Sequence, residues 1–200
     1  MPHIQSSKNT WEDHYTRKAR KESFPARSVF KLEEIQQKFK LIHRADAVLD
    51  LGCAPGSWLM YAARRTGAEG IVTGIDLKPL TISLPSHVQV FTADILNLPE
   101  GISNIIGRNF HVVMSDMAPS TTGDKRGDAA RSFELCQSAL YMAQSRLLPG
   151  GSFICKIFQG EDFNLFIQQV RALFLNHKIF KPQSCRKASR EIYVIGINKQ

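Results

Sequence analysis

Three apolar segments of the sequence end in an aspartate, and a fourth contains a lysine. The aspartates are Asp76, Asp94 and Asp116, and the lysine is Lys156, within the segment ICKIF. If these segments are neighbouring strands of an open α/β sheet, their polar residues lie near its carboxyl edge, where such sheets bind ligands. An aspartate there can accept hydrogen bonds from a ribose diol or an amino group. A lysine held among apolar side chains can act as a base towards a hydroxyl group, such as that of a ribose.

Each of these residues also has a purely structural explanation. An aspartate at a strand end can form a turn, and Lys156 can extend its ammonium outward past apolar neighbours. A nicotinamide-dependent dehydrogenase would use an aspartate at position 76 to bind a ribose diol, so Asp76 alone does not identify the cofactor. Three consecutive segments that end in aspartate nevertheless favour a ligand site over chance.

The segment VLDLGCAPGSW, residues 48–58, would complete such a site. It predicts a buried strand, a glycine-rich turn and the start of a helix, which together direct backbone N–H groups at a small ligand. Gly52 and Gly56 are four residues apart with Pro55 between them. This spacing differs from the GxGxxG of a pyrophosphate-binding loop, so the sequence disfavours a dehydrogenase.

Apolar segments alternate with helical patterns along the chain, which predicts an α/β fold with a mostly parallel sheet. We expect helices over 27–40, 57–66, 127–147 and 162–176, and strands over 47–53, 70–77, 88–94, 111–117, 150–158, 179–183 and 191–198. Only a short basic loop separates the last two strands, so they should pair antiparallel. The expected architecture is a Rossmann-like, seven-stranded sheet with one antiparallel strand and helices on both faces.

Charge is distributed unevenly along the 200 residues, whose formal net charge is +8. Residues 1–44 carry ten Lys and Arg against five Asp and Glu, residues 171–200 carry seven against one, and residues 45–170 carry nine against twelve. Basic ends fit a polyanionic partner, and an acidic centre fits a cationic small ligand. Charges placed only for solubility are the alternative.

Residues 1–26 form a basic N-terminal arm in this interpretation, and residues 27–200 form a single domain. Trp11 and Tyr15 are interleaved there with basic residues, namely Arg17, Lys18, Arg20, Lys21 and Arg27. This pattern is typical of a segment that faces RNA. A solvated amphipathic helix packed on the edge of the sheet explains it equally well.

Several classes of protein are disfavoured by what the sequence lacks. No apolar segment approaches the ~20 residues of a membrane span, and the N-terminus has no apolar signal segment. We therefore expect a cytoplasmic protein without a membrane partner. The four cysteines are scattered without the spacing of a zinc site, so we expect free thiols and no metal.

Four local blocks resemble the FtsJ/RrmJ family of RNA ribose 2′-O-methyltransferases, which use S-adenosylmethionine (SAM). The blocks are RSVFKL from Arg27, SDMAP from Ser115, KIFQG from Lys156 and SREIY from Ser189. The resemblance runs from about Trp11 to the end of the chain, and DLGCAPGSW resembles the family's cofactor motif. It implies the SAM-methyltransferase variant of the Rossmann-like fold and SAM as the cofactor, a sulfonium cation that suits the acidic centre.

The resemblance also implies roles for single residues. The implied catalytic set is Lys31, Asp116, Lys156 and Glu191, and the implied cofactor contacts are Gly56, Trp58, Asp76, Asp94 and Asp116. We expect Lys156 to deprotonate or polarise the ribose 2′-hydroxyl, and Asp116 and Glu191 to orient Lys156. Lys31 would add positive charge near Lys156 or hold the substrate. No metal is required by this scheme.

The blocks SDMAP, FQGE and SREIYV most resemble the bacterial branch that methylates a uridine ribose in large-subunit (23S-type) ribosomal RNA. A tRNA 2′-O-ribose methyltransferase of the same family and a catalytically inactive RNA-binding domain are the alternatives. We expect a monomer that acts on this RNA or on the assembled ribosomal subunit. Residues 120–128 are expected to form a mobile loop over the RNA. The expected RNA surface adds to the arm Lys125, Arg126, Lys181, Arg186, Lys187 and Arg190.

Overall fold

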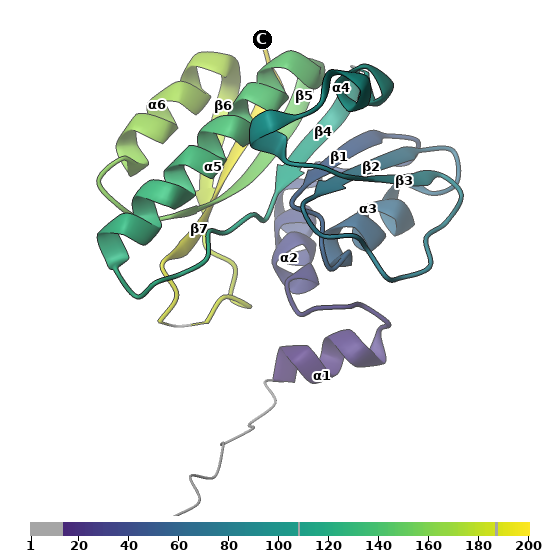
Figure 1. The fold of residues 1–200 in the computed structure, drawn as a ribbon, viewed down its shortest axis with the longest axis horizontal. Coiled ribbons are helices and arrows are strands. Elements are labelled where there is room, and N and C mark those ends of the chain that lie inside the picture. Colours follow the sequence, from purple (N-terminus) through teal and green to yellow (C-terminus); the bar gives the residue numbers. More distant parts are fainter. Residues whose placement is uncertain (1–13, 108, 187) are drawn as a thin grey trace, which may run out of the picture.

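A seven-stranded sheet crosses the part of the chain that this computed structural model describes, residues 14–107, 109–186 and 188–200 (Figure 1). The strand order is β3-β2-β1-β4-β5-β7-β6. The strands are β1 (Ala47–Leu51), β2 (Ile71–Asp76), β3 (Val88–Thr92), β4 (Phe110–Ser115), β5 (Leu147–Phe158), β6 (Phe174–Phe180) and β7 (Glu191–Lys199). Strand β7 is antiparallel to both β5 and β6, and the other pairs are parallel. This arrangement confirms the predicted sheet.

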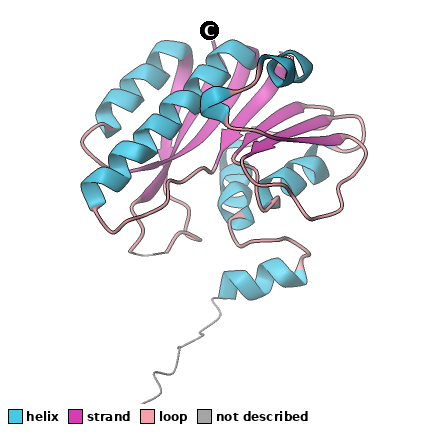
Figure 2. Ribbon diagram, in the orientation of Figure 1, coloured by secondary structure: helices cyan, strands magenta, loops and turns pink. Residues whose placement is uncertain are grey.

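Helices cover both faces of the sheet, also as predicted (Figure 2). One face carries α4 (Glu100–Ile106), α5 (Lys125–Arg146) and α6 (Phe163–Leu173), and the other carries α2 (Val29–Phe39) and α3 (Ser57–Thr66). Alternate side chains of β1 serve the two layers, because Val48 packs in the α3 layer and Leu49 in the α5 layer. None of the described helices combines the length and the apolarity needed to span a bilayer.

The turn between β1 and α3 depends on glycine at two positions. Gly52 and Gly56 have φ angles of 75° and 105°, in the left-handed region that side chains with a Cβ rarely adopt. A Cβ on Gly52 would lie only 2.2 Å from the Cγ of Met117, which follows β4. Glycine therefore lets the segments after β1 and β4 approach closely at the carboxyl edge of the sheet.

Strand β6 lies earlier in the chain than the strand expected over 179–183, and that prediction was wrong. The helix expected to reach residue 176 ends at Leu173, and β6 begins at Phe174. The ring of Phe174 is 2% exposed and stacks on Phe153, with ring centroids 6.0 Å apart. Gly196 leaves room for it, since a Cβ there would lie 2.6 Å from that ring. These partners are distant in sequence, so local helical periodicity does not reveal the boundary.

Two short elements were not expected from the sequence, α4 and the 3₁₀ turn η1 (Ile95–Asn97). Helix α1 (His14–Lys21) matches the amphipathic helix that was one of the two explanations of the basic segment. Residues 14–26, part of the predicted arm, pack on the domain, because Ala19 and Phe24 are buried in one cluster with Phe30 of α2. Arg17, Arg20 and Lys21 of α1 are exposed, whereas Lys18 Nζ lies 4.3 Å from the centroid of the Phe30 ring. Trp11 and the rest of residues 1–13, and Lys187, lie outside the described residues.

Candidate active site

A cavity of about 400 Å³ opens at the carboxyl edge of the sheet, beside the turn that follows β1. Asp76 at the end of β2, Asp94 after β3 and Asp116 after β4 all line it. The structure thus brings the three strand-end aspartates to one site, because neighbouring parallel strands end side by side. Gly52 and Ala54 form the wall between them.

Backbone amides hold two of these carboxylates in place. Asp76 accepts hydrogen bonds from Ala54 N at 2.9 Å and from Lys78 N at 2.8 Å. Asp94 caps η1 by accepting from Leu96 N at 2.9 Å. A carboxylate oxygen has more than one lone pair, so both groups keep capacity for a ligand while their orientation is fixed.

Gly56 and Trp58, two of the predicted cofactor contacts, lie behind this cavity rather than in its wall. A Cβ on Gly56 would lie 2.5 Å from the Cδ1 of Ile82, whose side chain covers the turn. Trp58 is 3% exposed, and its Nε1 donates to Ser28 O at 2.9 Å. In this arrangement both residues shape the turn, and their contact with a cofactor stays a prediction.

The side chains around the cavity fit an adenosyl cation such as SAM. Three carboxylates and a single lysine, Lys78, line it, so its charge favours a cation. Asp76 and Asp94 can accept from a diol and from an amino group, respectively. Apolar side chains supply contact area for a flat base, namely Ile75, Leu77, Ile95, Met117 and Leu135.

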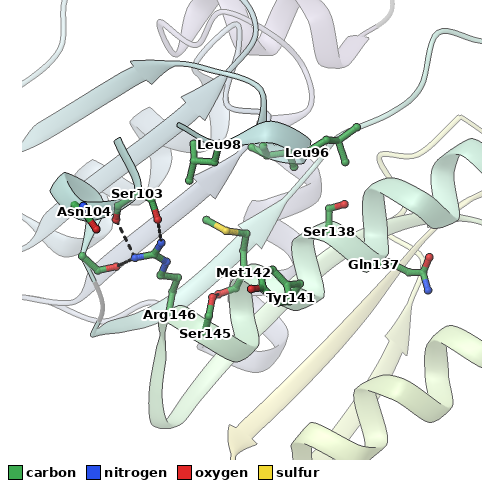
Figure 3. A pocket seen from close by; sticks show the side chains of 12 residues that line it. Leu96, Leu98, Ser103, Asn104, Gln137, Ser138, Tyr141, Met142, Ser145 and Arg146 are labelled. Atoms are coloured by element: carbon green, nitrogen blue, oxygen red, sulfur yellow. Dashed lines mark hydrogen bonds between the residues drawn. The ribbon is translucent and has the colours of Figure 1, made fainter. Parts of the chain in front are cut away.

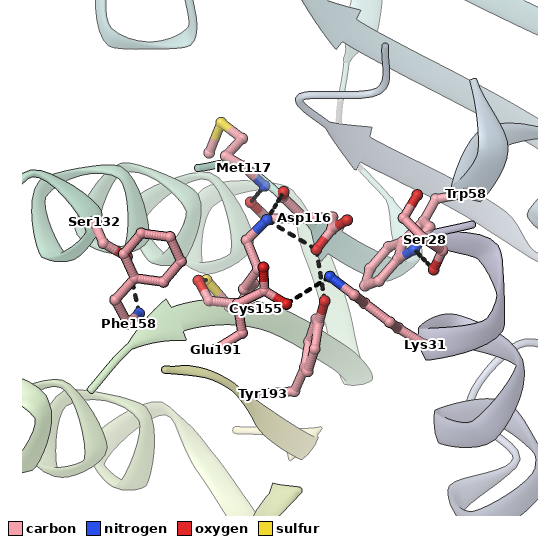
Figure 4. Close-up of polar contacts among 12 residues, drawn as sticks. Ser28, Lys31, Trp58, Asp116, Met117, Ser132, Cys155, Phe158, Glu191 and Tyr193 are labelled. Carbon is pink, nitrogen blue, oxygen red and sulfur yellow. Dashed lines mark hydrogen bonds and ion pairs between the residues drawn. The ribbon is translucent and has the colours of Figure 1, made fainter. Parts of the chain in front are cut away.

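The four residues of the predicted catalytic set converge beside this cavity. Figure 4 labels three of them, Lys31, Asp116 and Glu191. The four residues come from four elements, because Lys31 lies in α2, Asp116 follows β4, Lys156 lies in β5 and Glu191 begins β7. Lys156 Nζ is 3.1 Å from Asp116 Oδ1 and also donates to the backbone oxygen of Asp116. Lys31 Nζ is 2.6 Å from Glu191 Oε2. Two buried or half-buried ion pairs therefore stand side by side.

Burial makes these pairs matter more than surface ion pairs do. Lys156 is 5% exposed and Lys31 is 9% exposed. An ammonium so far from water is costly unless a carboxylate faces it. Burial alone would lower the pKa of Lys31, but the carboxylates of Asp116 and Glu191 outweigh it and raise that pKa. Lys31 is therefore a permanent cation at neutral pH.

Glu191 differs from its expected place, because it was expected to orient Lys156 and it pairs with Lys31 instead. Among the described residues, no ion pair joins Glu191 to Lys156. The positive charge of Lys31 is compensated by Glu191, so its expected effect on Lys156 is weakened. Asp116 alone of the two carboxylates holds the Nζ of Lys156.

Tyr193 is a site residue that the sequence reasoning missed. Its hydroxyl donates to Asp116 Oδ1 at 2.6 Å, and its ring stacks on Trp58 with centroids 5.8 Å apart (Figure 4). The ring is fully buried, and burial with the charge of Asp116 raises the pKa of this hydroxyl well above its usual range. Tyr193 therefore stays a neutral donor that fixes the Asp116 carboxylate. Glu191 and Tyr193 are two residues apart in a strand, so their side chains point to the same face of the sheet. This alternation is the signal by which the sequence could have placed Tyr193 beside Glu191.

Replacing Tyr193 with phenylalanine is expected to lower the rate of the predicted methyl transfer about ten- to hundredfold, the effect of losing one hydrogen bond to a charged group, about 1.5–3 kcal/mol. The ring and its stacking on Trp58 remain, so the variant should fold, with a midpoint of thermal unfolding that is lower by several degrees. Single-turnover kinetics would measure the rate. An unchanged rate would show that Asp116 is held without Tyr193.

A small basic pocket of about 220 Å³ lies on the outer side of the Lys31–Glu191 pair. Arg27, Ser28, Arg186 and Ser189 line it together with that pair. Partial burial and the charge of Arg186 lower the pKa of Arg27. Two guanidinium groups held near each other favour an anion between them, and a phosphodiester matches such donors.

The segment 120–128, expected to be a mobile loop over RNA, is held by hydrogen bonds within itself and by one from Arg190 in the structure. Asp128 accepts from Thr122 N at 3.0 Å, and Asp124 caps α5 by accepting from Arg126 N and Gly127 N. Helix α5 therefore begins at Lys125, earlier than the expected residue 127. Arg190 also donates to Lys125 O at 2.8 Å. Movement of this segment on binding RNA stays a prediction.

The largest of the described cavities lies elsewhere, in a groove of about 830 Å³ between α4 and α5 (Figure 3). Arg146 is the one charged residue among the described residues that line it, and it donates to Ser103 and Gly107 and so ties α5 to α4. Within the described residues, no group of three or more potential side-chain ligands is placed to hold a metal ion.

Comparison with known proteins agrees with this geometry. A family model for FtsJ-like methyltransferases matches residues 24–199. A protein from Desulfatibacillum aliphaticivorans is 55% identical over 200 residues, covering 100% of this chain and 97% of the relative. One from Desulforapulum autotrophicum is 54% identical over 193 residues, covering 96% and 95%. Both relatives are named ribosomal RNA large subunit methyltransferase E.

Solved structures with the same architecture are also methyltransferases or their relatives. A ribosomal RNA methyltransferase from Plasmodium falciparum matches with a TM-score of 0.75 at 25% identity, covering 88% of this chain and 98% of that one. Aeropyrum pernix fibrillarin, solved with S-adenosyl-L-methionine, matches with a TM-score of 0.62 at 14% identity, covering 85% and 76%. The second likeness supports the fold alone. The predicted methyltransferase variant of the Rossmann-like fold is confirmed.

Proposed function

Because the chain belongs to the FtsJ-like methyltransferase family, we propose that it transfers a methyl group from SAM to the 2′-oxygen of a uridine ribose in large-subunit ribosomal RNA. The observation that carries the proposal is the pairing of Lys156 with Asp116 at the end of a cavity lined by three carboxylates. The names of relatives that are more than 50% identical over nearly the whole chain support this RNA as the substrate.

In this mechanism the protein positions a ribose hydroxyl and assists the loss of its proton. SAM supplies, when bound, an electrophilic methyl group on a sulfonium. Lys156 is assigned to the 2′-hydroxyl, where as a neutral amine it accepts the proton, or as an ammonium it stabilises the negative charge that develops on the oxygen. Asp116 fixes the direction of Nζ through two contacts, with its carboxylate and with its backbone oxygen. Lys31 and Glu191 form a rigid wall on the side from which the RNA enters.

The RNA is proposed to bind along the face that carries the basic pocket next to Lys31. Arg27 and Arg186 lie there, and the exposed basic residues of α1 lie beyond them. One chain supplies all four residues of the proposed catalytic set, so we propose that a monomer acts on the ribosomal subunit. An enzyme with this substrate would act in the cytoplasm, where the subunits are assembled.

A methyl-transfer assay with labelled SAM tests the proposal. The substrates are large ribosomal subunits from a strain lacking this enzyme, naked ribosomal RNA and bulk tRNA. We expect label in a large-subunit ribose whose linkage resists alkaline cleavage. Label only in tRNA would keep the chemistry and overturn the substrate. SAM binding with no label in any substrate would indicate an inactive RNA-binding domain.

Replacing Arg186 with alanine is expected to weaken RNA binding about three- to tenfold and to reduce the slope of log affinity against log salt by about 1, the loss of one phosphate contact. SAM affinity should not change, because Arg186 lies outside the cofactor cavity. Fluorescence anisotropy of a labelled RNA fragment at several salt concentrations would measure both quantities. Arg44→Ala is the matched control, since Arg44 is an exposed arginine before β1, at the opposite edge of the sheet. An unchanged slope in Arg186→Ala would remove the pocket from the RNA path.

A further inference from the structure

Asp50 is a buried carboxyl group that the mechanism above does not use. It lies in β1, two residues before Gly52, and is 1% exposed. Neither of its carboxyl oxygens has a hydrogen-bond partner among the described residues. A buried polar group without a partner is rare in native structures and costs stability, so its presence calls for a functional explanation.

Among the described residues, no cation donates a hydrogen bond to Asp50. Its cross-strand neighbours are Gly74 of β2 and Met114 of β4, and Met114 belongs to the apolar layer beneath α3. The titratable groups that act on it are Asp76 from the end of β2, Asp116 from the segment after β4, and the thiol of Cys53 from its own turn.

The two lysines of the site, Lys31 from α2 and Lys156 from β5, are paired with Glu191 and Asp116. Burial, and then the negative charges of Asp116 and Asp76, raise the pKa of Asp50 well above its usual value. A carboxyl group in such a place takes up a proton rather than remain charged.

We propose that Asp50 senses the charge of the cofactor: it is protonated while the cavity is empty or holds the neutral product, and it gives up this proton when cationic SAM is bound. The inference rests on the proposed function, since it assumes that SAM occupies the cavity walled by Asp76 and Asp116. Asp50 does not line that cavity, so it acts through its charge rather than by direct contact.

Because the positive charge of SAM and the proton on Asp50 are linked, Asp50 has a role in the reaction cycle. Methyl transfer converts a sulfonium into an uncharged thioether, so the positive charge that favours ionised Asp50 disappears. Asp50 then takes up a proton, and the product loses an attraction that the substrate had. Because SAM binding releases a proton and product binding does not, preference for SAM over S-adenosylhomocysteine rises with pH.

Calorimetry of the full chain tests the proposal directly. SAM and S-adenosylhomocysteine are titrated at pH 6, 7 and 8 in two buffers with different enthalpies of ionisation, so that the difference in heat counts protons. We expect SAM to release more protons than S-adenosylhomocysteine does. The preference for SAM should increase with pH, by at most about tenfold per pH unit for one linked proton.

Asp50→Asn is the matching variant, because it keeps the shape and removes the titrating group. It should remove the extra proton release and flatten the pH dependence of the preference. Asp46→Asn is the control, since Asp46 is also a buried aspartate but precedes β1, at the far edge of the sheet. It should behave as the unaltered protein does.

Thermal unfolding of the empty protein gives an independent readout. Asp50 has a higher pKa folded than unfolded, so the folded state binds more protons between the two pKa values, and stability falls as pH rises through that window. Asp50→Asn should lose less stability than the unaltered protein over the same rise in pH.

Equal proton release with SAM and S-adenosylhomocysteine in the unaltered protein would overturn the charge-sensing role, even if Asp50→Asn failed to fold. Unequal release that persists in Asp50→Asn would assign the proton to another group and overturn it too. Failure of the unaltered protein to bind SAM at all would instead overturn the proposed function.

Discussion

Replacing Lys156 with alanine is expected to lower the methyl-transfer rate about 10²- to 10⁴-fold, the range for losing a positioned acid or base. Lys156 is 5% exposed, and its Nζ contacts Asp116 twice, so the position of its amino group is fixed. SAM binding should persist, because Lys156 does not line the cofactor cavity. Single-turnover kinetics and equilibrium binding of SAM would measure the two effects separately.

Lys156→Arg is the matched control for charge. Arginine keeps a cation near Asp116 but does not give up its proton in proteins. If Lys156 removes the proton of the ribose hydroxyl, Lys156→Arg should be as inactive as Lys156→Ala. Substantial rescue by arginine would show that positive charge alone suffices. Full activity in Lys156→Ala would contradict any role for this residue in the chemistry.

The sequence predicts the fold and the convergence of the strand-end aspartates well because both depend on local pattern. Asp76 and Asp94 follow recognisable apolar strands, and the order of parallel strands places their ends together. The antiparallel pairing of β6 with β7 follows from the short loop between them. The expected position of β6 was nevertheless wrong, because Phe174 is held by the distant residues Phe153 and Gly196.

The polar contacts of the site are less accessible from the sequence. Lys31 has the pattern of an ordinary helix surface, and only the family resemblance distinguishes it. Its pairing with Glu191 joins residues 160 positions apart, which no spacing rule contains. Tyr193 and Asp50 both lie in apolar strands, and in the sequence each stands only within a longer motif, SREIY and VLDLGCAPGSW respectively. Their roles depend on which charges face them, and that is a property of the folded chain.

Asp116 connects the cavity proposed for the cofactor with Lys156, so replacing it is expected to have the second large effect. It lines the cofactor cavity, pairs with Lys156 and accepts from Tyr193. Asp116→Asn removes the charge with little change in shape. We expect the methyl-transfer rate to fall about 10²-fold or more, because Lys156 loses its partner. SAM binding should weaken as well, since one of three carboxylates in the cavity is lost.

A double-mutant cycle distinguishes a shared role from two separate ones. If Asp116 acts on the chemistry by directing Lys156, the rate of Asp116→Asn with Lys156→Ala should be close to that of Lys156→Ala alone, because residues in contact act as a unit. The weakening of SAM binding should persist unchanged in the double variant, since Lys156 is outside the cavity. If the rate reductions of the two single variants multiply in the double variant, Asp116 and Lys156 do not act as a unit. Asp116 would then have a separate role towards the methyl donor. The methyl-transfer rate thus reports how Asp116 positions Lys156, and the affinity for SAM reports how Asp116 holds the cofactor.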